Sequence, residues 1–289
     1  MPRVITRVAF QGELGAYSEE AVRRYWCPQN VEPVPARTCG DVARMVERSE
    51  VDYGLLPIEN SLAGSVVATY DALAQSRDVW VVGETTLPIH HCLLAVPGAP
   101  LNDVRVVESH PVALEQCGRF LDSHQWLTAR AAYDTAGAAL EVSIARELER
   151  AAIAGRGAAE RFGLVVLAAD IEDRPDNQTR FLALSRTPAE PSSGLPVKTA
   201  IMATTPNTPG ALYRLLGPLA EYGINMSKLE SRPTGEPWTY SFFLELEHDL
   251  DPTDLARALD ALRAAATGLR VLGTFERIAA PSENSALSF

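Results

Sequence analysis

The chain of 289 residues is poor in cysteine and has no long hydrophobic run. Its four cysteines are widely spaced and form no C-x-x-C pair, so they signal neither a zinc site nor a redox pair. No apolar stretch approaches the length of a membrane span, and residues 1–7 lack the pattern of a secretory leader. We therefore expect a cytoplasmic protein with reduced thiols at Cys27, Cys39, Cys92 and Cys117.

Basic residues are also scarce, with 26 Lys and Arg against 37 Asp and Glu and a net charge of −11. Nucleic acids and anionic membranes favour a basic surface, so neither is an expected partner. A small anionic substrate stays open, because a few local donors decide its binding. The length suits two domains, and 46% hydrophobic with 22% charged residues is ordinary for a globular protein.

Strand and helix patterns alternate through the N-terminal part of the chain, which predicts an α/β fold with a largely parallel sheet. Three predicted strands end in polar clusters, which are Gln11-Gly12, Glu59-Asn60-Ser61 and Ser109-His110-Pro111. Ligands of open α/β sheets bind beyond the carboxyl ends of the strands, so these clusters favour one shared cleft. Ordinary strand-to-helix loops have the same composition, and this alternative stays open.

The run Asp176–Leu184 places an amide pair, a hydroxyl, a guanidinium and an aromatic ring beside one another. The hydroxyl of Thr179 can stabilise a departing oxygen in a dry, preorganised site. Arg180 is suited to binding a carboxylate through two hydrogen bonds, although a surface salt bridge is the simpler interpretation. Phe181 is expected either to form a wall of the cleft or to pack in the core.

Two further motifs are interpreted as structural rather than as cofactor sites. The run Gly155–Glu160 imitates a dinucleotide-binding loop, but Glu160 occupies the position where close helix packing requires glycine. His90 and His91 are adjacent, and adjacent residues of a strand point to opposite faces, so one metal cannot easily use both. We expect no metal and no other cofactor, and we interpret the histidine pair as a structural or interface segment.

A stretch rich in Pro, Ser and Gly ends the α/β part of the chain and predicts a linker. The pattern that follows is strand, helix, strand, strand, helix, strand, which is the ferredoxin-like order. Thr208 is predicted to cap the first of these helices, with Pro209 as its first residue. The predicted division is a first domain at 1–188, a linker at 189–196, a second domain at 197–279 and a tail at 280–289.

A series of motifs, in the family order along nearly the whole chain, resembles the prephenate dehydratase family with its C-terminal ACT domain. The family's signature is matched by Phe162, Leu164, Leu167, Asp173 and the run Thr179–Leu184. The other matches are Phe10–Ser18, Leu56–Ser61, Ser109–Cys117, Asp134–Ala136, Gly210–Leu212 and Glu230–Pro233. The last two lie in the second predicted domain, where the family's two phenylalanine-binding motifs occur.

The resemblance implies a fold, an activity and a form of regulation. The fold would be a two-lobed, periplasmic-binding-protein-like (type II) α/β catalytic domain followed by a ferredoxin-like βαββαβ ACT regulatory domain. The activity would be that of a carbon–oxygen lyase, which converts prephenate to phenylpyruvate by decarboxylating dehydration in L-phenylalanine biosynthesis, without metal or nucleotide. The resemblance also implies feedback control by phenylalanine and assembly into a homodimer or homotetramer.

The resemblance assigns site residues as well. Thr179 would be the catalytic donor to the departing hydroxyl of the substrate. The carboxylates and the pyruvyl oxygen would be held by Asn60, Ser61, Ser109, Gln116, Thr135 and Arg180, with Phe181 as a wall. Phenylalanine would bind the ACT domain at Asn207, Gly210, Ala211, Leu212, Glu230, Ser231, Arg232 and Pro233, with its carboxylate at a helix N-terminus.

Two alternative functions stay open at this point. The run Thr135–Ala139 departs from the Thr-Ser-Ala-Ala form of some family members, and similar stretches occur in relatives that use arogenate. The chain could also be a non-catalytic amino-acid sensor, in which a ligand-binding two-lobed domain is fused to an ACT module. The presence of Thr179, Arg180 and Phe181 together with Asn60 speaks against the sensor.

Overall fold

The computed structural model describes residues 5–26, 30–191 and 195–277, and it divides into two compact units. The first unit comprises Met1–Thr69 and Thr85–Phe181, and the second comprises Tyr70–Glu84 and Leu182–Phe289. These limits separate the compact parts of the chain and do not test the predicted domain borders, which stay predictions. The tail predicted at 280–289 lies outside the described residues.

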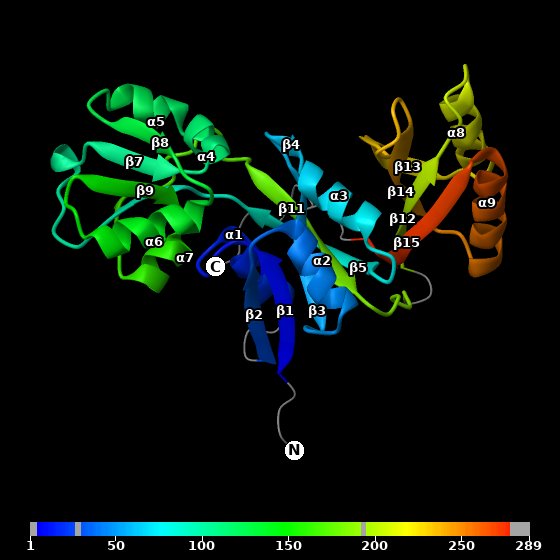
Figure 1. Ribbon diagram of the computed structural model, residues 1–289, viewed down its shortest axis with the longest axis horizontal. Helices are drawn as coiled ribbons and strands as arrows, with labels where there is room; N and C mark the ends of the chain where they lie inside the picture. The colour runs from blue at the N-terminus through cyan, green and yellow to red at the C-terminus, as the bar shows by residue number, and fades with distance from the viewer. Residues whose placement is uncertain (1–4, 27–29, 192–194, 278–289) are drawn as a thin grey trace. The chain divides into compact units, whose positions relative to one another are not determined.

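The first lobe of the chain is built on one sheet (Figure 1). Its strands, in spatial order, are β2 (Val31–Ala36), β1 (Thr6–Gln11), β3 (Tyr53–Asn60), β11 (Gln178–Ser185) and β5 (Trp80–Pro88). β1 pairs in parallel with β2 and β3, and its residues Val8, Ala9 and Phe10 are fully buried. The helices α1 (Tyr17–Tyr25) and α2 (Cys39–Glu47) pack against this sheet. Because β3 and β11 are neighbours, residues more than 100 positions apart meet at their ends.

The second lobe is built on another sheet, which the chain enters after β5 and leaves before β11. Its order is β10 (Val165–Ala168), β6 (Cys92–Ala95), β9 (Arg150–Ala154), β7 (Val106–Ser109) and β8 (Thr128–Ala131). The helices of this lobe are α4 (Pro111–Gln116), α5 (Gly118–Ser123), α6 (Thr135–Ala145) and α7 (Arg156–Phe162). Because the chain crosses twice between the sheets, the predicted two-lobed α/β architecture is confirmed.

The C-terminal part of the second unit is an antiparallel sheet with two helices. Its strands, in spatial order, are β13 (Asn225–Pro233), β14 (Tyr240–His248), β12 (Val197–Thr204) and β15 (Gly268–Glu276). The helices α8 (Ala211–Glu221) and α9 (Pro252–Ala265) bury Leu215, Leu219, Ala258 and Leu262 in the same core as β12 and β14. The predicted ferredoxin-like βαββαβ order is therefore confirmed.

The predicted start of the helix after β12 is wrong by two residues. The structure begins α8 at Ala211, and its N-cap is Gly210 rather than Thr208. Gly210 has φ of 75°, a left-handed conformation that glycine adopts without strain and that ends the preceding loop. The Arg214 guanidinium donates to the Pro209 carbonyl at 3.2 Å and to the Thr208 hydroxyl at 3.4 Å, so Thr208 and Pro209 stay in that loop.

Within the second unit, Gly273 of β15 approaches the backbone of Val81 in β5 so closely that a Cβ would overlap the Val81 carbonyl. We expect Gly273→Ala to lower the free energy of unfolding by about 2–3 kcal/mol, because backbone cannot yield as a side chain can. Urea unfolding measures the loss. Gly217→Ala is the matched control, since Gly217 lies in α8 and a Cβ there would have no atom of the described residues within 4 Å. The control should gain about 0.5–1 kcal/mol, and equal behaviour of both variants would contradict the close approach.

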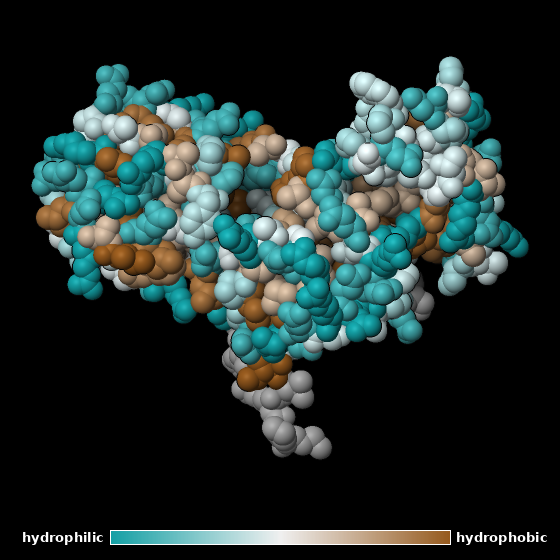
Figure 2. All heavy atoms as spheres, viewed as in Figure 1, coloured by the Kyte–Doolittle hydropathy of each residue, from teal (hydrophilic) through white to brown (hydrophobic). Residues whose placement is uncertain are grey.

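The surface of the described residues is mixed in polarity. On the face in Figure 2, hydrophobic residues form small islands among hydrophilic ones. Among the helices within 5–26, 30–191 and 195–277, none has the length and hydrophobicity that crossing a membrane requires. Cys39, Cys92 and Cys117 are buried and free.

Candidate active site

A cleft of about 410 Å³ lies within the first unit and is lined by residues from both lobes. It receives the end of β3, the start of β11, the first turn of α1 and the starts of α4 and α6. The polar residues of its lining are Gln11, Tyr17, Ser18, Asn60, Ser65, His91, His110, Gln116, Tyr133, Asp134, Thr135 and Thr179. The polar clusters predicted at strand ends thus contribute Gln11, Asn60 and His110 to one cleft.

Strand β11 presents alternate residues to the cleft. Thr179 and Phe181 belong to the lining, and Phe181 is also 1% exposed, so it is both wall and core. Arg180 lies between them on the opposite face, where its Nη2 is 3.3 Å from Oε2 of Glu59 on the neighbouring strand β3. The structure therefore pairs Arg180 with a carboxylate and does not bring it into the cleft lining.

Three amide side chains form a hydrogen-bonded cluster beside Thr179, which we call the amide cluster: Asn60, Gln116 and Asn177. Asn60 Nδ2 donates to Asn177 Oδ1 at 2.8 Å, and Asn177 Nδ2 donates to Gln116 Oε1 at 3.0 Å. Gln116 Nε2 reaches back to Asn60 Oδ1 at 3.4 Å. Asn177 is fully buried, and these bonds connect β3, α4 and the residue that precedes β11.

The amide cluster orients the Thr179 hydroxyl. Asn60 Nδ2 donates to Thr179 Oγ1 at 3.0 Å, which makes the threonine oxygen an acceptor on that side. The threonine hydrogen is then directed away from Asn60, and Thr179 lies in the cleft lining. A hydroxyl held this way is a preorganised donor for a developing negative charge.

Three further predicted substrate-binding residues take different positions. Thr135, the first residue of α6, lies in the cleft lining. Ser61 is outside the lining, and its hydroxyl contacts the Asp176 carbonyl at 3.3 Å and accepts from Gln178 N at 3.0 Å. Ser109 is fully buried and donates to the Ile153 carbonyl at 2.6 Å. Both serines therefore fix the loops and strands behind the cleft in this conformation.

Several residues that line the cleft were not predicted from the sequence, and His91 is the most important of them. It was interpreted as a structural or interface segment on the assumption of a regular strand, but β6 begins only at Cys92. His91 is buried and contacts Tyr17 and Gln116. Tyr17 and Asp134 could have been found, because both stand in motifs that carried the family resemblance.

Asp134 and Tyr133, two titratable residues of the cleft lining, have raised pKa values. Burial raises the pKa of Asp134, against hydrogen bonds from the backbone that include Gly137 N at 2.9 Å. Burial and a hydrogen bond to Glu13 raise the pKa of Tyr133 to about 12. Tyr133 is therefore a neutral hydrogen-bond donor at the rim of the cleft over the whole physiological pH range.

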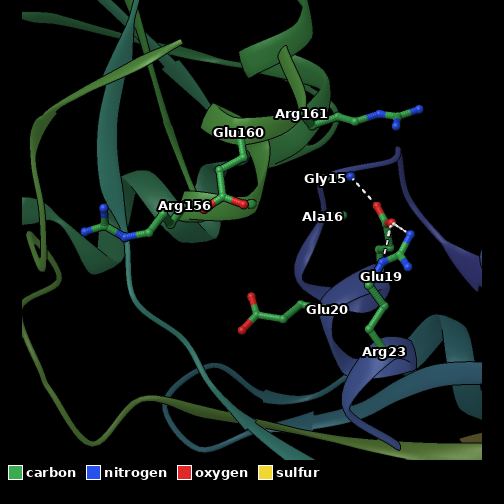
Figure 3. A pocket seen from close by; sticks show the side chains of 9 residues that line it. Gly15, Ala16, Glu19, Glu20, Arg23, Arg156, Glu160 and Arg161 are labelled. Carbon is green, nitrogen blue, oxygen red and sulfur yellow. Dashed lines mark hydrogen bonds and ion pairs between the residues drawn. The ribbon is translucent and has the colours of Figure 1, made fainter. Parts of the chain in front are cut away.

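A second, open hollow of about 610 Å³ lies between α1 and α7 and includes part of the dinucleotide-like run Gly155–Glu160. Its six charged residues balance, as three Glu and three Arg. Figure 3 shows that Arg156 and Arg161 leave α7 in opposite directions, so they do not converge on one phosphate. Glu19 is already bonded to Gly15 N and to Arg23. The hollow thus offers no set of converging donors for a nucleotide among the residues that the structure describes.

The residues predicted to bind phenylalanine lie on two elements of the second unit. Asn207 is exposed in the loop before α8, Gly210 is its N-cap, and Ala211 and Leu212 begin the helix. Glu230, Ser231, Arg232 and Pro233 form the end of β13. Arg232 makes a two-pronged ion pair with Asp71, at 3.0 and 3.1 Å. A ligand of Arg232 would have to share the guanidinium with that carboxylate.

The fold and the cleft define a two-lobed α/β enzyme followed in the chain by a ferredoxin-like domain. A family model for prephenate dehydratase matches residues 8–189, and one for the ACT domain matches residues 199–264. The chain belongs to the prephenate dehydratase family, whose members include arogenate dehydratases. It is accordingly a dehydratase, a carbon–oxygen lyase, with a C-terminal ACT domain.

Named relatives align with nearly the whole of this chain. Arogenate dehydratase 2 of Petunia hybrida is 40% identical over 284 residues, covering 93% of this chain and 71% of that protein. A prephenate dehydratase from Arthrobacter aurescens, solved in complex with L-Phe, has a TM-score of 0.87 and 32% identity over 94% of this chain and 90% of its own. A structure described as GqqA, a novel type of quorum quenching acylase, has a TM-score of 0.84 and 36% identity over 95% of this chain and 98% of its own.

Proposed function

We propose that this chain converts prephenate to phenylpyruvate in L-phenylalanine biosynthesis. The observation that carries the proposal is the oriented Thr179 hydroxyl in a polar cleft, within the segment that matches the family model. Thr179 is the donor to the departing hydroxyl. Asn60, Gln116 and Thr135 hold the carboxylates and the pyruvyl oxygen, and Phe181 covers the ring.

The reaction depends more on orienting the substrate than on activating it. Loss of carbon dioxide and hydroxide leaves an aromatic ring, so the reaction is strongly downhill once both groups are aligned to leave. The cleft supplies that alignment by binding the substrate in one pose. Negative charge develops on the departing oxygen, and a fixed donor such as Thr179 lowers the barrier at that point. Arg180, Ser61 and Ser109 support this arrangement from behind the lining.

Arogenate is the second candidate substrate. It differs from prephenate by an amino group in place of the keto oxygen, so the same ring chemistry applies. The 40% identity to an arogenate dehydratase and the run Thr135–Ala139 both favour this candidate. A non-catalytic sensor is disfavoured, because the family model that matches residues 8–189 is that of a dehydratase and named relatives such as arogenate dehydratase 2 are dehydratases.

The ACT domain is proposed to bind L-phenylalanine as a feedback effector in a homodimer or homotetramer. Support comes from the related prephenate dehydratase that was solved in complex with L-Phe. The effector site would be formed by Asn207, Gly210, Ala211, Leu212, Glu230, Ser231, Arg232 and Pro233. We further propose that the enzyme acts in the cytoplasm without metal or nucleotide.

The test is an assay of the purified full chain with prephenate and with arogenate in separate reactions. We expect phenylpyruvate from prephenate, and added L-phenylalanine should lower the initial rate. Phenylalanine formed faster from arogenate would reverse the order of the two substrates. If neither phenylpyruvate nor phenylalanine forms while the chain still binds prephenate or arogenate, the sensor is established instead. A rate that is indifferent to L-phenylalanine, together with no calorimetric binding, would remove the effector proposal alone.

A further inference from the structure

His91 belongs to the cleft lining and contacts a hydrogen-bonding group through each ring nitrogen. Its Nε2 is 3.0 Å from Gln116 Oε1, and its Nδ1 is 2.8 Å from the Tyr17 hydroxyl. The same hydroxyl is 2.7 Å from the His90 carbonyl. Both His91 and Tyr17 belong to the cleft lining.

The amide cluster determines which nitrogen of His91 carries a proton. The backbone N–H groups of Leu62 and Ala63 donate to Asn60 Oδ1 at 3.0 and 2.9 Å, which fixes the Asn60 amide, because an N–H can only donate. Asn60 Nδ2 is then a donor, so the atom of Asn177 that it contacts is an oxygen. The chain of bonds continues to Gln116 Oε1, an acceptor. His91 Nε2 must therefore donate, and a neutral His91 has its lone pair at Nδ1.

With this tautomer, the His90 carbonyl and His91 Nδ1 both need a hydrogen from the Tyr17 hydroxyl, which has only one. Burial raises the pKa of Tyr17, so the hydroxyl keeps its single hydrogen. That hydrogen can serve the His90 carbonyl or His91 Nδ1, but both acceptors lie within 2.8 Å of the oxygen. A second proton on His91 Nδ1 would satisfy every contact: Nδ1 would donate to Tyr17, Tyr17 to the His90 carbonyl, and Nε2 to Gln116.

The charge of the cleft makes that second proton useful. Prephenate carries two carboxylates, and among the described residues that line the cleft there is no lysine or arginine. Only His91 and His110 of this described lining can become cations. The titratable groups that face His91 and Tyr17, or stand across the cleft from them, are Glu20, His90, Cys92, Cys117, Glu172, His110 and Asp134. Of these, Glu172 Oε2 accepts from the His91 backbone N at 2.9 Å and favours a positive ring.

We propose that His91 takes up a proton at Nδ1 when the dianionic substrate binds, and supplies it through Tyr17 to the departing hydroxide. The inference rests on the proposed function for the identity of the substrate. In this proposal Tyr17 is the catalytic residue of the pair, because its hydroxyl belongs to the cleft lining and would contact the departing oxygen, and His91 is a positioning and proton-holding residue that acts through it. In the structure, burial lowers the pKa of His91, against the effects of Gln116 and Glu172, which favours a neutral ring at neutral pH.

The step balances in atoms and charge. The ring C–O bond breaks as the carboxylate C–C bond breaks, and the released electron pair completes the aromatic ring. The Tyr17 hydroxyl turns its hydrogen from the His90 carbonyl to the departing oxygen, which takes that proton and leaves as water, while the Tyr17 oxygen takes the proton of His91 Nδ1. The substrate dianion and one proton become the phenylpyruvate monoanion, carbon dioxide and water, and His91 ends neutral. A side chain that titrates near neutral pH suits this transfer better than threonine alone.

The first test is nitrogen NMR of the full chain with ¹⁵N-labelled histidine, which gives only five residues to assign. His91→Gln identifies the His91 signals by their loss. We expect the free protein to have the proton on Nε2 and a bare Nδ1. With prephenate bound to Thr179→Ala, which turns over slowly, both nitrogens should be protonated at the same pH. A bare Nε2 in the free protein, or bound prephenate with unchanged His91 nitrogens, would overturn the proposal.

The second test is the pH profile of turnover. Glutamine at position 91 retains a donor near Nε2 and cannot titrate, so the amide cluster keeps its orientation. We expect His91→Gln to lower kcat about tenfold to a hundredfold. The fall of kcat with rising pH should be present in the wild type and absent in the variant, because only protonated His91 supplies the proton. His124→Gln, outside the cleft lining, is the control and should keep the wild-type profile.

The two tests separate this inference from the proposed function. If neither prephenate nor arogenate turns over, the proposed function fails, while the tautomer of the free protein is still decided by NMR. If turnover is normal and His91→Gln keeps both the rate and the alkaline fall, the function stands and the role of His91 is overturned.

Discussion

Thr179→Ala is expected to lower kcat by a factor on the order of 10²–10³ with KM nearly unchanged, because the hydroxyl acts on charge that develops only in the transition state. The alanine keeps the strand and removes only the donor. Asn60 Nδ2, which donates to Thr179 Oγ1 at 3.0 Å, retains Asn177 Oδ1 at 2.8 Å and the Gln178 carbonyl at 3.1 Å as acceptors. The fold and the ground-state contacts of the cleft should therefore persist. Steady-state kinetics with prephenate measures the split between kcat and KM.

Thr179→Ser is the matched control, since it keeps the hydroxyl and loses only a methyl group. We expect it to retain activity within about tenfold, because the same donor remains but with more rotational freedom. Thr128→Ala, on the exposed strand β8, checks for effects of handling and should match the wild type. An alanine variant with full turnover would remove Thr179 from its proposed role, and a variant that changes only KM would make it a binding residue.

The sequence predicted the fold where local patterns and global architecture agree. The alternation of buried and exposed residues and the turn residues of the second unit were sufficient for its βαββαβ order. The polar ends of β3 and β7 pointed to a cleft, and Asn60, Gln116, Thr135, Thr179 and Phe181 do line one. The start of α8 was misplaced because Thr208 and Pro209 have good capping chemistry, yet Gly210 takes the left-handed conformation that sets the boundary.

What could not be predicted depends on contacts between distant segments. His91 and Tyr17 are 74 positions apart, and Asn60 and Asn177 are 117 apart, so no local spacing indicates either contact. The interpretation of His91 failed on a physical assumption, that the histidine pair lies in a regular strand. The segment from Ile89 to His91 is instead irregular, with Ile89 N bonded to the Asn177 carbonyl, and this turns His91 toward the cleft.

Lys198→Met is the stability prediction with the largest expected effect, because Lys198 is the cation at the centre of a buried acidic cluster in the second unit. Its Nζ is 3.0 Å from Glu84, and 3.7 Å from both Glu245 and Glu247. The Lys198 side chain is 10% exposed, and those of Glu84 and Glu245 are 3% and 1%. Removing one partner of a buried ion pair leaves charge without compensation, so we expect a loss of about 3–5 kcal/mol in the free energy of unfolding.

The pH dependence and a double variant of this cluster distinguish lost charge from lost packing. Burial raises the pKa of Glu247, but hydrogen bonds and the charges of Lys198 and Arg277 outweigh it and the pKa is lowered. A lowered folded pKa gives stability above the unfolded pKa, about 4.3, which is lost as the pH falls through the folded value. The gap between the wild type and Lys198→Met in urea unfolding should therefore persist from pH 7 to about 4.3 and narrow as the pH falls below that value. Lys198→Met combined with Glu84→Gln removes one of the repelling carboxylates and should recover part of the loss at pH 7. A gap that is independent of pH and unchanged in the double variant would assign the effect of Lys198 to the packing of its alkyl chain.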